Sequence, residues 1–222
     1  MIQRVFPALV ALFMPFSAVY ASPVASADVS TLGLGVNLQM PLSHVLAFRI
    51  GLNHWRQARQ GVYTGNSSSI GYDGNVRLQS LALLVDYAPG AGIFHLTAGV
   101  IRDSNEISAT GVPDASGNYT IDGGTYPASV VGTLSGYIAA KPWASYLGVG
   151  WGTNPAGQPG LSIGTDLGVM FQGSPEVQLT ASNPMNSPQV AAAVSSAQQT
   201  AQQQANKYKY YPVAGVSVGY RF

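Results

Sequence analysis

The sequence predicts an all-β protein, an eight-stranded antiparallel up-and-down transmembrane β-barrel with long external loops. Its end, residues 214–222, alternates apolar and polar residues up to a terminal phenylalanine, which is typical of the last strand of a bacterial outer-membrane barrel. Charged residues make up only 9% of the chain, against roughly 25% in soluble domains. After the N-terminal segment there is no apolar run of the ~18 residues that a helical span needs. A closed barrel satisfies both observations, because only every second residue of its strands must be apolar.

The N-terminal segment predicts a signal peptide over residues 1–21. A short cationic stretch ending at Arg4 precedes an apolar stretch over residues 5–19 that is too short to span a membrane. Small residues then offer a favoured cleavage site after Ala21 and an alternative site after Ala27. Residues 22–222 are therefore expected to form the barrel, in the outer membrane of a Gram-negative bacterium.

Charge and cysteine content exclude other classes. The chain has ten Lys and Arg and nine Asp and Glu, so cleavage behind Arg4 leaves a neutral protein. Without a basic surface, nucleic acid is not an expected partner. The chain has no Cys, which excludes a disulfide scaffold.

Alternation of apolar and polar residues predicts the strands in order. On the first clear strand the apolar face runs from Leu32 through Leu34 and Val36. Two strand-like segments, separated by Lys141 and Pro142, are interpreted as one long bulged strand over residues 130–153. An even number of strands then requires a short first strand within residues 22–30. The other predicted strands cover residues 31–40, 44–56, 75–88, 93–103, 161–172 and 208–222.

The lengths of the connections predict the orientation, because bacterial barrels keep short turns and both termini in the periplasm. The long connections, residues 57–74, 104–129 and 173–207, are then external loops. The short ones, residues 41–43, 89–92 and 154–160, are then periplasmic turns.

Two of the predicted external loops contain local structure. Residues 119–126 indicate a small hairpin around an Asp-Gly pair. Ser187 and Pro188 suit the start of a helix over residues 189–206, rich in Ala and Gln and uncharged. We expect this helix to pack on the external mouth as a lid; the alternative is a mobile Ala/Gln-rich loop.

The inward faces predict an ion-pair network of Arg49, Asp86 and Asp166 inside the barrel. An eight-stranded barrel is only wide enough for its side chains to fill it, and charges there must pair. The network is either a structural plug or a solute-binding or gating site. The predicted inward polar residues are Asn37, Gln39, Arg49, Asn53, Asp86, His95, Asp103, Asp166 and Arg221.

Catalysis is not expected. His44 falls at a periplasmic turn, His54 shares the parity of lipid-facing Leu52, and His95 points inward away from the outer leaflet. None of them forms a Ser/His or Asp/His constellation at the outer rim. Without Cys or a His pair at ligand spacing, no metal site and no cofactor are expected.

Four segments together resemble a known family. They are residues 118–126, 145–152, 166–179 and 208–213, which recur in this order in the ornithine-uptake, carbapenem-associated outer-membrane porins. The resemblance covers about the C-terminal half of the chain well and the first strands only by pattern.

The resemblance implies a monomeric eight-stranded barrel that takes part in passive uptake of small solutes, basic amino acids among them. The alternative is a structural or surface-interaction barrel with a plugged lumen and no transport. The interior shows no obvious surplus of acids for a cationic solute. Expected partners are outer-membrane lipid, small polar solutes and the barrel-assembly machinery, for which Phe222 is the predicted assembly signal.

Overall fold

A computed structural model describes residues 22–65, 68–89, 93–152, 159–183 and 187–222. The predicted signal peptide, residues 1–21, and most of the predicted turns at 89–92 and 154–160 lie outside these residues. The described residues form thirteen strands and two helices, and every strand pairing is antiparallel.

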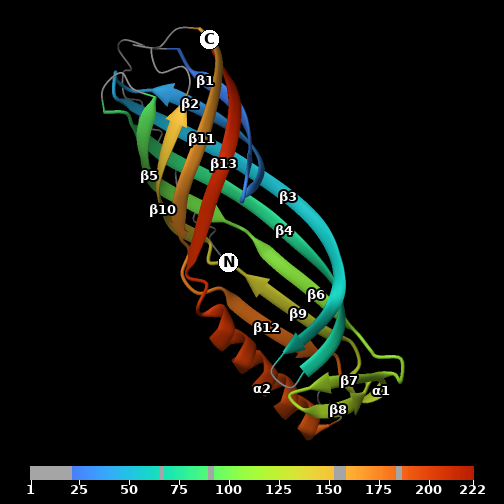
Figure 1. The fold of residues 1–222 in the computed structure, drawn as a ribbon. Helices are drawn as coiled ribbons and strands as arrows, with labels where there is room; N and C mark the ends of the chain where they lie inside the picture. The colour runs from blue at the N-terminus through green and yellow to red at the C-terminus, as the bar shows by residue number, and fades with distance from the viewer. Residues whose placement is uncertain (1–21, 66–67, 90–92, 153–158, 184–186) are drawn as a thin grey trace, which may run out of the picture.

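Eight of the strands close into a ring, shown in the upper part of Figure 1. Each strand pairs with the next, and the last pairs back onto the first. The ring therefore has the predicted number of strands, including the first strand that the sequence pattern shows only weakly. Its members are β1 (Val24–Ser30), β2 (Gly33–Pro41), β3 (Leu46–Gly65), β4 (Ser68–Tyr87), β5 (Phe94–Asp103), β10 (Trp143–Gly152), β11 (Gly160–Phe171) and β13 (Tyr210–Arg221).

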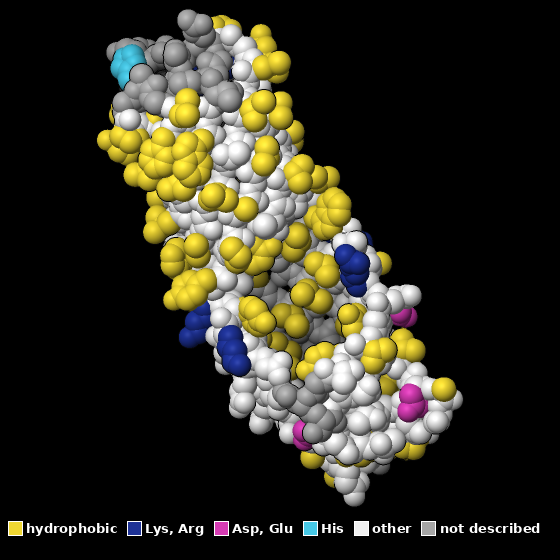
Figure 2. All heavy atoms as spheres, viewed as in Figure 1, with side chains coloured by type: hydrophobic (Ala, Val, Ile, Leu, Met, Phe, Trp, Pro, Cys, Tyr) yellow, Lys and Arg dark blue, Asp and Glu magenta, His cyan; other side chains and the backbone are white. Residues whose placement is uncertain are grey.

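The two faces of the ring differ as the alternation predicts. Outward apolar side chains are exposed, among them Val36 and Val218, and hydrophobic side chains are spread over the visible face of the ring in Figure 2. Inward neighbours such as Ser80 and Asp86 are buried. Leu32 is an exception, because it is buried inside the ring rather than on the outer face. It lies in the β1–β2 turn, where the backbone leaves the strand and the alternation no longer applies.

Part of the same continuous sheet, called here the second sheet, extends beyond one end of the ring (Figure 1). The far halves of β3 and β4 continue past the ring, and three further strands add to β4 in the order β6 (Glu106–Val112), β9 (Leu134–Ala139) and β12 (Glu176–Ala181). A hairpin of β7 (Asn118–Ile121) and β8 (Gly124–Pro127) and the short helix α1 (Ala128–Val131) complete this end. The thirteen strands thus exceed the eight that the sequence predicts.

The second sheet corrects three predictions. Residues 57–74 are not a loop but the arms of the long β3–β4 hairpin, paired without interruption. The region 104–129 contains three strands. Residues 130–153 are not one bulged strand, since β9 belongs to the second sheet and β10 to the ring. Lys141 and Pro142 separate the two, and proline cannot donate a hydrogen bond to a strand ladder.

The hairpin and the long helix are present. Asp122 and Gly123 both have positive φ, +48° and +79°, as a tight two-residue hairpin turn requires. Helix α2 (Pro188–Ala205) starts at Ser187, whose hydroxyl accepts from the Val190 amide, with Pro188 in its first turn. The region 173–207 also contains β12.

Helix α2 lies along the edge of the second sheet rather than across the mouth of the ring (Figure 1). Two glutamines one turn apart accept hydrogen bonds from the edge strand: Gln202 Oε1 from the Val177 amide at 2.9 Å and Gln198 Oε1 from the Leu179 amide at 3.1 Å. These side chains take the place of a neighbouring strand and cover an edge that would otherwise be open to pairing.

Candidate functional site inside the ring

A charged cluster fills the half of the ring interior that lies away from the second sheet. Arg49 comes from β3, Asp86 from the adjacent β4, and Asp166 from β11 across the ring. Glycines on the ring strands leave room for the larger interior side chains. A Cβ atom on Gly150 would collide with the His95 ring, and one on Gly168 with the Tyr146 hydroxyl.

The structure brings all three predicted residues together. Arg49 Nη1 lies 3.0 Å from Asp166 Oδ2, and Arg49 Nη2 lies 3.0 Å from both Asp166 Oδ1 and Asp86 Oδ1. The Arg49 side chain is 13% exposed and that of Asp86 only 3%. Buried ion pairs of this kind are strong. Each charge also needs its partner, because a buried charge without one destabilises the folded protein.

Further polar side chains contact both carboxylates. Gln39 Nε2 donates to Asp86 Oδ2 at 3.0 Å, and the Thr97 hydroxyl donates to Asp86 Oδ1 at 2.7 Å. His95 Nε2 lies 3.3 Å from Asp166 Oδ1. Sequence reasoning placed His95 inward but did not join it to the network. Only the strand register reveals the contact, because His95 and Asp166 both pair with Gly150.

The interior contains a surplus of acids that the sequence analysis did not expect. Asp28, on the weakly patterned first strand, faces inward and accepts from Asn37 Nδ2 at 2.7 Å. This partner of Asp28 is an amide and not a cation. Across the ring strands the inward acids are Asp28, Asp86, Asp103 and Asp166, against the inward arginines Arg49 and Arg221.

An apolar layer fills the other half of the interior, next to the second sheet. Ile101 and Met170 are almost completely buried there, at 1% and 0% exposure, and Leu32 of the β1–β2 turn packs with them. The remaining members of the layer are Ala82, Leu84, Ala144, Tyr146 and Val213. Side chains therefore fill the ring at two levels, as expected for a ring of eight strands.

The second sheet carries a polar groove of about 290 Å³ on the face that continues the outer surface of the ring. Asn75, Ser108, Ser135, Tyr137, Gln178 and Thr180 are among its lining residues. Glu106 lies beside the groove and joins two groups: it pairs with Arg77 at 2.9 Å and accepts from the Tyr137 hydroxyl at 2.9 Å. This hydrogen bond raises the pKa of Tyr137. In the part of the chain that the structure describes, no group of His, Cys, Asp or Glu could hold a metal ion.

Aromatic pairs lie on the outer surface at both ends of the ring. Phe171 and Tyr210 meet edge to face at 5.6 Å, at the end next to the second sheet. At the other end are Phe94 with Trp151, at 5.8 Å, and Tyr220 with Phe222, at 5.4 Å. Phe222 lies just beyond β13, where its side chain is 60% exposed and its amide donates to the Pro23 carbonyl at 3.2 Å.

Among solved structures, the chain is similar to two proteins of Acinetobacter baumannii. CarO2 shares 20% sequence identity with a TM-score of 0.59, over 91% of this chain and 99% of CarO2. CarO shares 17% identity with a TM-score of 0.54, over 91% of this chain and 98% of CarO. These are carbapenem-associated outer-membrane proteins of the kind that the sequence resembles. The resemblance is confirmed. At this identity it is a likeness of fold.

No protein-family model matches the sequence, and no curated protein matches it either. Within the described residues, no helix combines the length and apolar character that a membrane span requires.

Proposed function

We propose that this protein is a monomeric outer-membrane β-barrel that takes part in passive uptake of small solutes, basic amino acids among them. The ring is the membrane-spanning part. The second sheet and α2 lie outside the cell, and the short turns at the other end of the ring face the periplasm.

The aromatic pairs support the membrane location. Tyr210 and Tyr220 each belong to a pair and lie ten residues apart on β13. At ~3.3–3.4 Å per residue and a tilt of ~35–45°, this separation corresponds to a height of about 23–28 Å. Outer-membrane barrels have an apolar band of ~25 Å between two aromatic girdles. Between the pairs the outward residues of β13 include Val216 and Val218, both more than half exposed.

The acid surplus inside the ring carries the uptake proposal. A solute with two cationic groups, such as ornithine or arginine, would be attracted to a carboxylate like that of Asp28, whose described partner is the neutral Asn37. Arg49 holds Asp86 and Asp166 in place across the ring. Leu32 is the member of the apolar layer that lies on a turn, so we infer that its displacement opens the external end.

The second candidate is a structural or surface-interaction barrel with a plugged interior. The observation in its favour is the apolar layer itself, in which Ile101 and Met170 leave almost no exposed surface. A cation crossing this layer would lose its hydration without gaining a partner, which is costly.

Liposome swelling with the purified protein distinguishes the two functions. We expect the wild type to admit ornithine and arginine faster than a neutral amino acid and a sugar, and we expect Asp28→Asn to reduce that preference. Leu32→Ala should increase the rate for every solute, whereas Val218→Ala on the outer face should leave it unchanged. If the wild type admits no solute above a protein-free control, uptake is excluded. Permeation that appears only in Leu32→Ala would establish the plugged barrel.

A further inference from the structure

We propose that the outer surface of the barrel binds the phosphate groups of a phosphorylated glycolipid of the outer leaflet, and that Lys141 and Lys209 form the main contact. This inference rests on the membrane location given above and is independent of solute uptake.

The cations of the chain are distributed unevenly. Apart from Arg4, which lies outside the described residues, and the inward Arg49 and Arg221, all Lys and Arg lie at or beyond the end of the ring next to the second sheet. They are Arg56, Arg59, Arg77, Arg102, Lys141, Lys207 and Lys209. At the opposite end, no Lys or Arg of the described ring strands faces outward. Anionic headgroups at the external surface alone would match this asymmetry.

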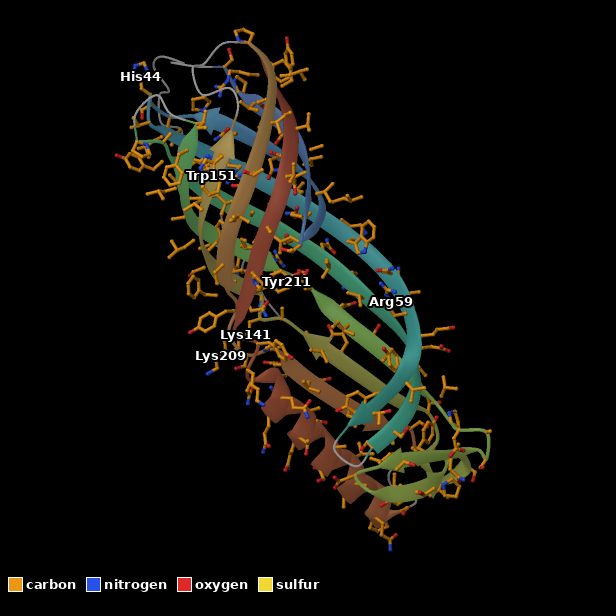
Figure 3. The ribbon with its side chains drawn as sticks, viewed as in Figure 1. His44, Arg59, Lys141, Trp151, Lys209 and Tyr211 are labelled. Carbon is orange, nitrogen blue, oxygen red and sulfur yellow. The ribbon has the colours of Figure 1, made fainter. Side chains whose placement is uncertain are left out.

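Lys141 and Lys209 form a pair around Gly173. The amide of Gly173 donates to the Lys209 carbonyl at 3.2 Å. The stem and Nζ of Lys141 lie 3.3–3.8 Å from the position that a Cβ atom of Gly173 would occupy. Gly173 also has a φ of +71°, so its backbone conformation and lack of a side chain both fit this close approach. Figure 3 shows the two lysines together on one side of the molecule, with Arg59 on the opposite side.

Among the described residues, neither lysine has an acidic partner. Within the described chain, Lys141 and Lys209 form no ion pair, although Glu176 follows Gly173 by only three residues. By contrast Arg77, on the other side of the second sheet, is held by Glu106. Two neighbouring ammonium groups without an acidic partner concentrate positive charge, and such a pair can bind a phosphate.

On the periplasmic side of the two lysines the outer surface of the ring is apolar, which favours contact with acyl chains over contact with water. Lys209 directly precedes Tyr210 of the Phe171–Tyr210 pair, and Lys141 precedes Trp143, whose side chain is 59% exposed on the outer face. Apolar residues follow on both strands toward the periplasm. Cations therefore lie at the level where a lipid headgroup meets its acyl chains. This arrangement favours a lipid-borne phosphate over free phosphate, for which the aromatic residues would have no role.

Native mass spectrometry of the refolded protein in detergent tests the site with four probes: diphosphorylated lipid A, dephosphorylated lipid A, phosphatidylglycerol and inorganic phosphate. We expect the wild type to bind diphosphorylated lipid A most tightly. One Lys near an anionic surface contributes about 5-fold in affinity. Lys141→Gln/Lys209→Gln should therefore weaken binding on the order of 30-fold and reduce its salt dependence.

Arg56→Gln/Arg59→Gln is the matched control, because it removes the same charge from β3 and should change affinity less than about 3-fold. An equal loss in both double variants would mean that binding follows net charge, and the lysine site would be wrong. Equal affinity for the dephosphorylated lipid, or preference for inorganic phosphate or phosphatidylglycerol, would also overturn the proposal. Heat-modifiable migration in gels reports the folded barrel in every sample, and the swelling assay is read separately. Failure of uptake therefore does not affect this test.

Discussion

Replacing Arg49 by methionine should destabilise the ring because it leaves two carboxylates without their cation. Three Arg49 contacts of 3.0 Å are lost, two to Asp166 and one to Asp86. Breaking a buried pair by removing one partner typically costs 3–5 kcal/mol. The remaining donors, Gln39 and Thr97 on Asp86 and His95 beside Asp166, offset part of that cost. We therefore expect a loss of about 3 kcal/mol, at the lower end of the range.

Urea unfolding in lipid vesicles, followed by tryptophan fluorescence, measures this free energy. The informative comparison is a triple variant in which Arg49→Met is combined with Asp86→Asn and Asp166→Asn. Because the triple variant buries no unpaired charge, it should recover most of the loss. If Arg49→Met costs less than ~1 kcal/mol, the size of a median surface pair, the cluster does not stabilise the ring. If the triple variant is as unstable as the single one, the unpaired carboxylates are not the cause.

Three further predictions concern the membrane. Val216→Arg should cost ~2–4 kcal/mol in the same unfolding assay, whereas Val216→Leu should cost little; similar values for both would place this face away from lipid. Ser116→Cys and Ser195→Cys should react with an impermeant thiol reagent on intact cells and Leu42→Cys should not, and the reverse pattern would invert the topology. Deleting Phe222 removes one aromatic, a loss of ~1–3 kcal/mol, so refolding into detergent should survive. Assembly in cells should nevertheless fail if the residue is an assembly signal, and unchanged assembly would make it an ordinary strand end.

The sequence predicts the ring well because its outer face follows a simple rule. Most outward residues are apolar, so alternation identifies the strands and their faces, and the inward parity brings Arg49, Asp86 and Asp166 to one level. The alternation of faces fails where the backbone leaves the strand. Leu32 satisfies the alternation but occupies a turn, and it packs inside. The sequence does not predict that Asp28 faces inward, because its strand is too short to show a clear alternation.

The sequence does not predict the second sheet, because the outward residues of its strands are no longer apolar. Along β4 the outward residues change from Leu83 and Leu81 within the ring to Gln79, Arg77 and Asn75 beyond it. The hydrogen-bonded ladder to β3 continues across this change without a break in register. Beyond the ring the outward face of a strand is no longer apolar, so a paired strand looks like a Gly- and Ser-rich loop.

In the proposed membrane location, the same change on β3 and β4 would mark the external limit of the membrane. Leu52 pairs with Leu81 on the ring side, and His54 pairs with Gln79 immediately beyond. Lipid contact would then end between two successive outward pairs, about 7 Å apart along the strands. Arg56 pairs with Arg77 at the next outward step, so the polar character of this face continues beyond the ring. The long hairpin joins the ring to the second sheet through an uninterrupted ladder, so in the proposed location it would hold the polar groove just above the lipid surface.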